Sequence, residues 1–205
     1  MVITIELRLS RPTAIEKLQA FMARPSNARQ QLVETAARLF QSRGFHGTGL
    51  SLILEESGAP KGSFYHHFPG GKDELAVAAM QWSSLEIEDF IETAFKDAKT
   101  FQAGAKAFSV RLADWFEKSG FSEGCPVASV LLETAPESDD LRREALAIFD
   151  LWIGALESQA RRLGYNHPRK TAEALMMGLE GAWLLARARQ SRKPFEIAVS
   201  SALAG

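Results

Sequence analysis

The sequence predicts an all-α fold in which a head of three short helices precedes a larger helical body. Apolar residues recur at the three- and four-residue spacing of one helix face in nearly every segment after residue 25. Glycines and prolines fall between these segments, where helices end and begin. The 205 residues are enough for two small domains, and we place them at residues 23–72 and 73–205.

Residues 1–22 follow a different pattern from the rest of the chain. Apolar and polar residues alternate from Ile3 to Leu9, which is a strand period, and a helical spacing then leads up to Met22. A single strand has no partner in a helical chain, so one interpretation is a mobile, disordered arm. The alternative is that Met22 is the native start and that the preceding residues are not native.

Two helices are predicted in the first part of the head. The first covers residues 26–44, with Ser26 as N-cap, Gly44 just past its end, and an apolar face that includes Leu39 and Phe40. The second follows Thr48, whose hydroxyl we expect to cap it. Both helices are short, so the head is expected to pack against the body.

Residues 58–68 predict a tight turn followed by a third, short helix. Gly58 suits the end of one helix and Pro60 the first turn of the next. Phe64 and Phe68 are four residues apart and share one face, which leaves cationic, hydroxyl and aromatic groups for the other faces. Such groups contact phosphates and base edges in the major groove of DNA. The residues expected to face the groove are Lys61, Gly62, Ser63, Tyr65 and His66.

The charge distribution favours a nucleic-acid contact that is limited to the head. Residues 23–72 hold six Lys or Arg residues against three acids, whereas residues 73–205 hold 15 basic and 20 acidic residues. A basic head on an acidic body is typical of a protein that touches DNA with one end.

Neither a metal nor a cofactor is expected. Adjacent His66 and His67 would point about 100° apart on a helix, and no cysteine or acid at ligand spacing joins them. Gly70, Gly71 and Lys72 lack the upstream glycine and the Ser or Thr of a phosphate-binding loop.

The body is predicted to start with a long helix over residues 72–99. Five more helices follow at about residues 101–118, 126–135, 139–163, 168–190 and 194–204. Large side chains are frequent in this part, and they either form the core or line a pocket for a small apolar or aromatic ligand. The candidate ligand-binding residues are Trp115, Phe116, Cys125, Trp152, Met176, Glu180 and Trp183. Cys125 is either a buried small hydrophobe or a reactive sensor thiol.

The last two predicted helices carry a candidate dimer interface. Small residues recur every four positions on the 168–190 helix, and apolar residues line one side of the 194–204 helix. The helices either pack within one chain or pair with their twins in a homodimer. The residues predicted for this interface are Ala174, Gly178, Ala182, Phe195, Val199 and Leu203.

Cysteine content and hydropathy predict a cytoplasmic protein. Cys125 is the single cysteine, so no intrachain disulfide can form. No apolar run reaches the roughly 18 residues of a membrane span, and the N-terminus lacks the features of a signal peptide.

Several motifs of the head resemble the N-terminal domain of the TetR (tetracycline-repressor) family of bacterial transcription regulators. They are Gly44-Phe45-x-Gly47-Thr48, the run from Gly58-Ala59-Pro60-Lys61-Gly62-Ser63 to Phe64-Tyr65-His66-His67-Phe68, and Lys72-Asp73-Glu74-Leu75. The resemblance implies that Thr48 and Lys72 hold DNA phosphates. It also implies a C-terminal ligand-binding and dimerisation domain.

Other residues refine this resemblance. Gly124-Cys125-Pro126-Val127, with Glu133 further on, is similar to the subgroup of lincomycin- and flavonoid-responsive repressors. Gly49 stands where Ser or Thr often opens the second helix, so one phosphate contact is in doubt. Gly70-Gly71 adds a residue before Lys72, which changes the reach of that side chain.

These observations predict a homodimeric repressor that binds operator DNA and releases it when a small-molecule effector binds. One alternative is an architectural DNA-binding protein without a ligand. The other is an all-α enzyme of unrecognised chemistry, although no nucleophile elbow, paired metal ligands or dinucleotide fingerprint occurs. We therefore expect a protein that is not an enzyme.

Overall fold

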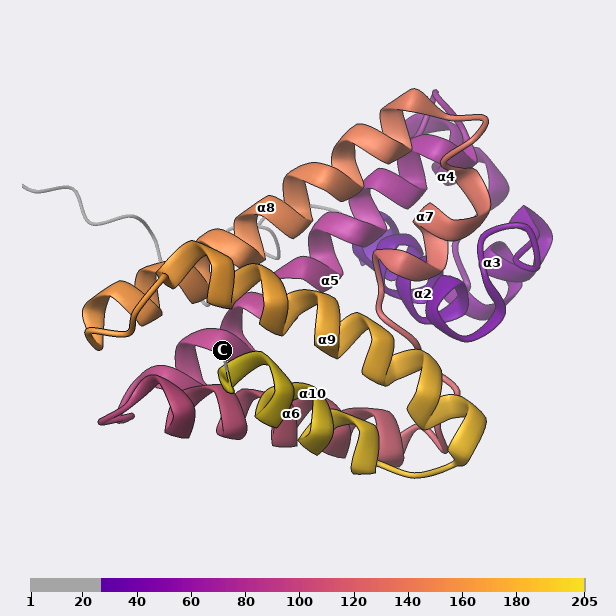
Figure 1. Ribbon diagram of the computed structural model, residues 1–205. Helices are drawn as coiled ribbons and strands as arrows, with labels where there is room; N and C mark the ends of the chain where they lie inside the picture. The colour runs from indigo at the N-terminus through magenta and orange to yellow at the C-terminus, as the bar shows by residue number, and fades with distance from the viewer. Residues whose placement is uncertain (1–26, 205) are drawn as a thin grey trace, which may run out of the picture.

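The computed structural model describes residues 27–204, which form helices joined by turns and short loops, without a strand (Figure 1). The predicted all-α fold is confirmed for this part of the chain. The arm predicted at residues 1–22 lies outside the described residues, as does the suggested start at Met22. Within the described part, no helix is long and apolar enough to cross a bilayer.

The head consists of α2 (Asn27–Arg43), α3 (Leu50–Ser57) and α4 (Lys61–His67). Their apolar faces meet in one small core, and its largest side chains are at most 1% exposed. They are Leu32, Leu39, Phe40, Ile53, Phe64 and Phe68. The predicted i, i+4 aromatic pair is part of this core, since the rings of Phe64 and Phe68 lie 5.8 Å apart. The core therefore fixes which faces of α4 point outward.

The turn between α3 and α4 forms as the sequence predicts. Gly58 ends α3 in the left-handed conformation, with φ at 66°, and its N–H donates to the carbonyl of Glu55. Pro60 is the N-cap of α4, one residue before the first turn. Residues 58–60 thus join two short helices tightly, which is the connection of a helix-turn-helix.

The predicted cap of α3 is wrong. Thr48 is fully buried, and its hydroxyl donates to the carbonyl oxygens of Gly44 at 2.8 Å and Leu39 at 3.3 Å. The side chain therefore closes the end of α2 and does not reach forward to α3, which begins after Gly49 without a side-chain cap. The last carbonyl groups of a helix have no hydrogen-bond partner within that helix. Those at the end of α2 therefore accept the hydroxyl that would otherwise cap α3.

The helix α5 (Lys72–Phe95) connects head and body. Its 24 residues span about 36 Å, and it contacts α2 in the head as well as α6 and α8 in the body. The proposed domain boundary at residues 72 and 73 falls in its first turn, so a tilt of this helix would move the head relative to the body.

The body contains α6 (Phe101–Lys118), α7 (Ala128–Thr134), α8 (Asp139–Arg162), α9 (Pro168–Arg189) and α10 (Lys193–Leu203). Side chains cap two of these helices: Thr100 accepts from Ala103 N–H, and Ser138 accepts from Leu141 N–H. Pro168 opens α9 as predicted. In Figure 1 the long helices α5, α8 and α9 run from the head end to the far end, α10 packs along α9, and α6 packs against α5 and α10.

The short helix α7 lies between the head and the body. It starts at Ala128, two residues after the predicted Pro126, and it contacts α2 in the head on one side and α8 in the body on the other (Figure 1). It is therefore the second link between the two parts, after α5.

Candidate functional site

The outward face of α4 carries the residues that the sequence predicted for DNA contact. Lys61, Gly62, Tyr65 and His66 are exposed, and Ser63 is half-buried. Tyr65 is 52% exposed, although its ring edge contacts the buried Phe64. About half of this side chain is therefore available to a binding partner. The structure thus brings together one cation, two hydroxyl groups and an imidazole on a surface without acids.

Two residues predicted to hold phosphates are engaged within the protein. The hydroxyl of Thr48 is buried and hydrogen-bonded, as described above, so it cannot face DNA in this conformation. The ammonium group of Lys72 lies 4.0 Å from the ring centre of Phe45. Partial burial lowers the pKa of Lys72, while the carboxylates of Asp73 and Glu133 act in the opposite direction. A phosphate contact by Lys72 remains a prediction.

A carboxylate of the body holds the loop between α2 and α3. Glu133, near the end of α7, accepts a hydrogen bond from the backbone N–H of His46 at 2.6 Å. The backbone carbonyl of Glu133 lies 3.3 Å from the imidazole of the same histidine. At Gly44, with φ at 75°, any side chain would overlap the Glu133 carboxylate. The sequence offered Glu133 as a subgroup marker, but no local pattern could show that it touches the head.

A cavity of about 620 Å³ lies beside this contact, between the end of α2, the segment around α7, and helices α8 and α9. Its walls include the apolar side chains of Leu131, Leu132, Phe149, Trp183 and Leu184. Leu132 and Leu184 are 81% and 71% exposed, so they leave apolar surface open to water at the cavity. A mostly apolar cavity of this size is typical of small-molecule sites.

Three of the seven predicted ligand-binding residues line this cavity, namely Cys125, Glu180 and Trp183. The other four do not. Phe116 and Met176 are core residues, and Trp152 is also buried, with its indole N–H donating to the carbonyl of Ser84. Trp115 packs edge-on behind Trp183 and borders a different hollow. Helical spacing shows which residues are buried, but not which buried residues border an empty space.

Glu180 is one of the charged residues that line the cavity. One of its carboxylate oxygens is buried and has no hydrogen-bond partner among the described residues. Burial raises the pKa of Glu180 to about 7, and a hydrogen bond from the Cys125 thiol offsets part of this rise. A carboxyl group with this pKa is present in both its neutral and its charged form at neutral pH.

Cys125 lacks the properties of a reactive thiol. It is 3% exposed, and burial together with the nearby Glu180 carboxylate raises its pKa well above the ordinary value. Its sulfur accepts a hydrogen bond from the N–H of Ala128 at the start of α7. These features favour the alternative of a small buried side chain. Residues 27–204 also contain no group of three or more His, Cys, Asp or Glu that could hold a metal ion.

The predicted dimer residues divide into two groups. Phe195 and Val199 are buried within the protomer, where Phe195 contacts Phe116 and Trp183, so these two side chains belong to the core of the chain. Ala182 is also buried, but it lines a hollow between α9 and α10. The remaining residues Ala174, Gly178 and Leu203 are partly exposed. A side chain at Gly178 would first meet Ala198 of α10, so its close approach is within the chain.

A different set of side chains forms an exposed apolar face on α9 and α10. Met177, Leu185 and Ile197 are 69%, 46% and 47% exposed. They border a shallow hollow together with Gly181, Ala198 and other small residues. We call these residues the α9–α10 face. Three of the predicted interface residues, Ala174, Gly178 and Ala182, border the same hollow. The dimer interface itself stays a prediction.

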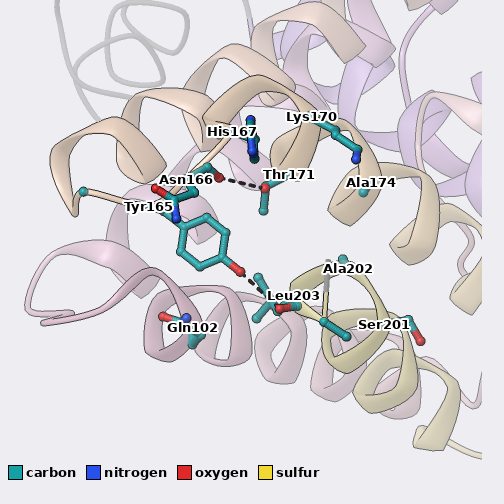
Figure 2. Close-up of a pocket in the computed structure, with 12 residues that line it drawn as sticks. Gln102, Tyr165, Asn166, His167, Lys170, Thr171, Ala174, Ser201, Ala202 and Leu203 are labelled. Atoms are coloured by element: carbon teal, nitrogen blue, oxygen red, sulfur yellow. Dashed lines mark hydrogen bonds between the residues drawn. The ribbon is translucent and has the colours of Figure 1, made fainter.

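Figure 2 shows another hollow, of about 590 Å³, at the end of the body between the α8–α9 turn and the end of α10. Its polar groups are partly engaged with each other. The hydroxyl of Tyr165 donates to the carbonyl of Leu203, and that of Thr171 donates to the carbonyl of Asn166. Neither the DNA-facing residues nor the candidate ligand residues border it.

Comparison with known families identifies both parts of the chain. Residues 32–79 match the family described as bacterial regulatory proteins, tetR family. Residues 102–201 match the C-terminal domain of LmrA/YxaF-like transcriptional regulators. The HTH-type transcriptional regulator LmrA of Bacillus subtilis (strain 168) is 33% identical over 170 residues, which cover 82% of this chain and 90% of LmrA. The chain belongs to the TetR family.

The fold of this TetR-family regulator is also that of solved family members. A regulatory protein TetR from Rhodobacter sphaeroides has a TM-score of 0.77 at 25% identity, covering 86% of this chain and 97% of that one. CifR, solved in complex with 26-base-pair double-stranded operator DNA, has a TM-score of 0.75 at 21% identity, covering 89% and 99%. The resemblance predicted from the motifs of the head is therefore confirmed, and the chain is a helix-turn-helix transcriptional regulator.

Proposed function

We propose that this TetR-family regulator is a homodimeric repressor that binds double-stranded operator DNA through α4 and releases it when a small, mostly apolar molecule binds the body. It acts as a regulator and not as an enzyme, in the cytoplasm where its DNA is located. The observation that carries the proposal is the exposed, acid-free face of α4, held outward by the Phe64 and Phe68 core.

The proposed DNA contacts are those of the helix-turn-helix geometry. In this arrangement the second helix lies in the major groove and its first residues contact base edges. Here that helix is α4, and no acidic residue stands in its first turn. The residues proposed for base or backbone contact are Lys61, Gly62, Ser63, Tyr65 and His66. The relative CifR, solved on operator DNA, supports this use of the fold.

Dimerisation is proposed through the α9–α10 face. A single head reads too few base pairs to be selective, and a two-fold dimer doubles the site. The three large exposed side chains of this face lie on the last two helices, on the side that the protomer leaves uncovered. Burying them against a second copy would remove apolar surface from water.

Selection of DNA from a random-sequence pool tests the proposed function. The full chain is expected to enrich a two-fold symmetric motif, with half-sites about 34–36 Å apart or somewhat further if two dimers share one operator. Lys61→Ala should lose the enrichment, whereas Lys118→Ala, which removes an exposed lysine from the end of α6, should retain it. A wild-type protein that enriches no motif would rule out operator recognition.

A further inference from the structure

The junction of α2 and the α2–α3 loop is hydrogen-bonded to the body at two places. The N–H of His46 donates to the Glu133 carboxylate at 2.6 Å, and the imidazole of His46 lies 3.3 Å from the backbone carbonyl of Glu133. Near the end of α2, the carbonyl of Gln41 accepts from the N–H of Gly124 at 3.2 Å. Hydrogen bonds with a charged partner are stronger than those between neutral groups, so the bond to the carboxylate is the stronger of these links.

Two glycines of the loop make this contact possible. At Gly44 an added Cβ would overlap a carboxylate oxygen of Glu133, and at Gly47 it would overlap the carbonyl oxygen of Arg43. Gly44 also has a φ of 75°, which favours glycine. The loop thus leaves room for the carboxylate directly against its backbone.

Hydrogen bonds within the loop connect His46 to α3. The hydroxyl of Thr48 donates to the carbonyl of Gly44 at 2.8 Å, and its N–H donates to the carbonyl of Phe45 at 3.2 Å. The helix α3 begins two residues after Thr48, and residues 58–60 join it directly to α4. A displacement of His46 would therefore move the start of α3, and α4 with it.

Glu133 is not part of the apolar core that folds the head. That core consists of apolar side chains of α2, α3 and α4, whereas Glu133 is half-buried and contacts the loop through polar groups. The head also contacts the body through α2 and α5. Removing the carboxylate should therefore leave the head folded but less firmly oriented on the body.

We propose that Glu133 is a positioning residue for operator recognition: through His46 it fixes the orientation of α4 relative to the body, and so the distance between the two heads of a dimer. The inference rests on the proposed function, which it deepens by naming a residue that sets the half-site spacing. Each base pair added between half-sites displaces one of them by about 3.4 Å and rotates it by about 35°. A dimer with firmly oriented heads rejects an operator of changed spacing, because its two heads cannot bind at the same time.

Operators of two lengths test this role. The full-length wild type should bind the selected operator at least about ten-fold more tightly than the same operator with two base pairs added between its half-sites. In Glu133→Ala this ratio should fall to about two- or three-fold, since loosely oriented heads adapt to both spacings. A change of one base within a half-site should weaken both proteins by the same factor.

An exposed acid of the same region provides the control. Glu137→Ala, just after α7, should keep the ratio of the wild type. A merely structural role of Glu133 would weaken binding to both operators equally. An unchanged ratio in Glu133→Ala therefore overturns the proposal.

A glycine substitution displaces the carboxylate without removing it. Gly44→Ala should push the Glu133 side chain away from His46, so it should lose the spacing preference as Glu133→Ala does. Gly164→Ala is the matched control, because its φ of 66° imposes the same backbone strain while an added Cβ there meets no atom within 4 Å. A Gly44→Ala variant that keeps the wild-type ratio contradicts the proposal.

Amide hydrogen exchange of the free protein measures the link without DNA. Peptides that cover the α2–α3 loop should exchange faster in Glu133→Ala than in the wild type, whereas the buried part of α2 should exchange equally. Equal exchange of the loop in both proteins overturns the proposal. A wild type that enriches no operator would overturn the proposed function, and the positioning role with it. An unchanged spacing ratio in a variant that binds operator overturns the positioning role alone.

Discussion

The outward face of α4 and the cavity beside α7 differ in where their residues come from. The α4 face is a run of consecutive residues on one short helix, and the two phenylalanines that orient it lie in the same run. The cavity combines residues from α2, α7, α8 and α9 that are spread over more than a hundred positions of the sequence. A surface made by one helix follows from its periodicity, whereas a space between four helices depends on how they pack.

Breaking the α9–α10 face should have the largest effect on function. Leu185→Glu or Ile197→Glu places a charge among apolar side chains, so the dimer should dissociate and operator affinity should fall by roughly 100-fold or more. Sedimentation velocity and operator titration measure the two effects. Leu151→Glu, at an exposed leucine of α8, is the matched control and should remain dimeric. A dimeric Ile197→Glu variant places the interface on another surface.

Substitutions of two neighbouring aromatic residues of α4 should differ in their effect on the free energy of unfolding. Phe64 is fully buried, so Phe64→Ala should lower the free energy of unfolding by about 3–5 kcal/mol. Tyr65 is half exposed, so Tyr65→Ala should change it by less than about 0.5 kcal/mol. Urea unfolding measures both values. A large loss for Tyr65→Ala would show that its ring belongs to the core.

The buried acid of the cavity predicts a dependence of stability on pH. Because the folded-state pKa of Glu180 is raised from 4.5 to about 7, the folded state binds more protons, and its stability falls as pH rises between these values. The difference is about 3 kcal/mol at most. Besides Glu180, the titratable residues that line the cavity are Cys125, Glu133, Arg43 and Arg187.

Comparison with a neutral side chain isolates this effect. Glu180→Gln should match the wild type at about pH 5 and exceed it in stability at about pH 8. Urea unfolding of both proteins at the same concentration measures the difference. Equal pH profiles would show that Glu180 finds a partner or reaches solvent in the folded protein.

Thr48 provides the smallest and most specific test of the head. Its hydroxyl closes the end of α2, so Thr48→Val should cost about 1 kcal/mol of stability. Operator affinity should not change, because no phosphate contact is lost. A loss of about 1 kcal/mol of operator affinity would instead support the phosphate contact that family resemblance implied.

The sequence predicted the fold, the helix α4 and its buried side well because these depend on local signals. Gly58 and Phe64 with Phe68 define the turn and the buried side of α4 without any long-range information. The ligand residues were harder to predict. Trp152 and Trp183 each lie on the apolar face of a helix in the sequence pattern, but only Trp183 borders the cavity. Similarly, Phe195 and Ile197 lie on one helix, and only packing against α6 decides that Phe195 is the inner one.

Operator affinity of the α4 variants tests the central claim most directly. Fluorescence anisotropy with the selected operator should show that Lys61→Ala and Tyr65→Ala each weaken binding by about 1–3 kcal/mol. The exposed-lysine control Lys118→Ala should bind as the wild type does. Unchanged affinity in both α4 variants, with the protein folded and dimeric, would contradict the assignment of α4 as the helix that reads DNA.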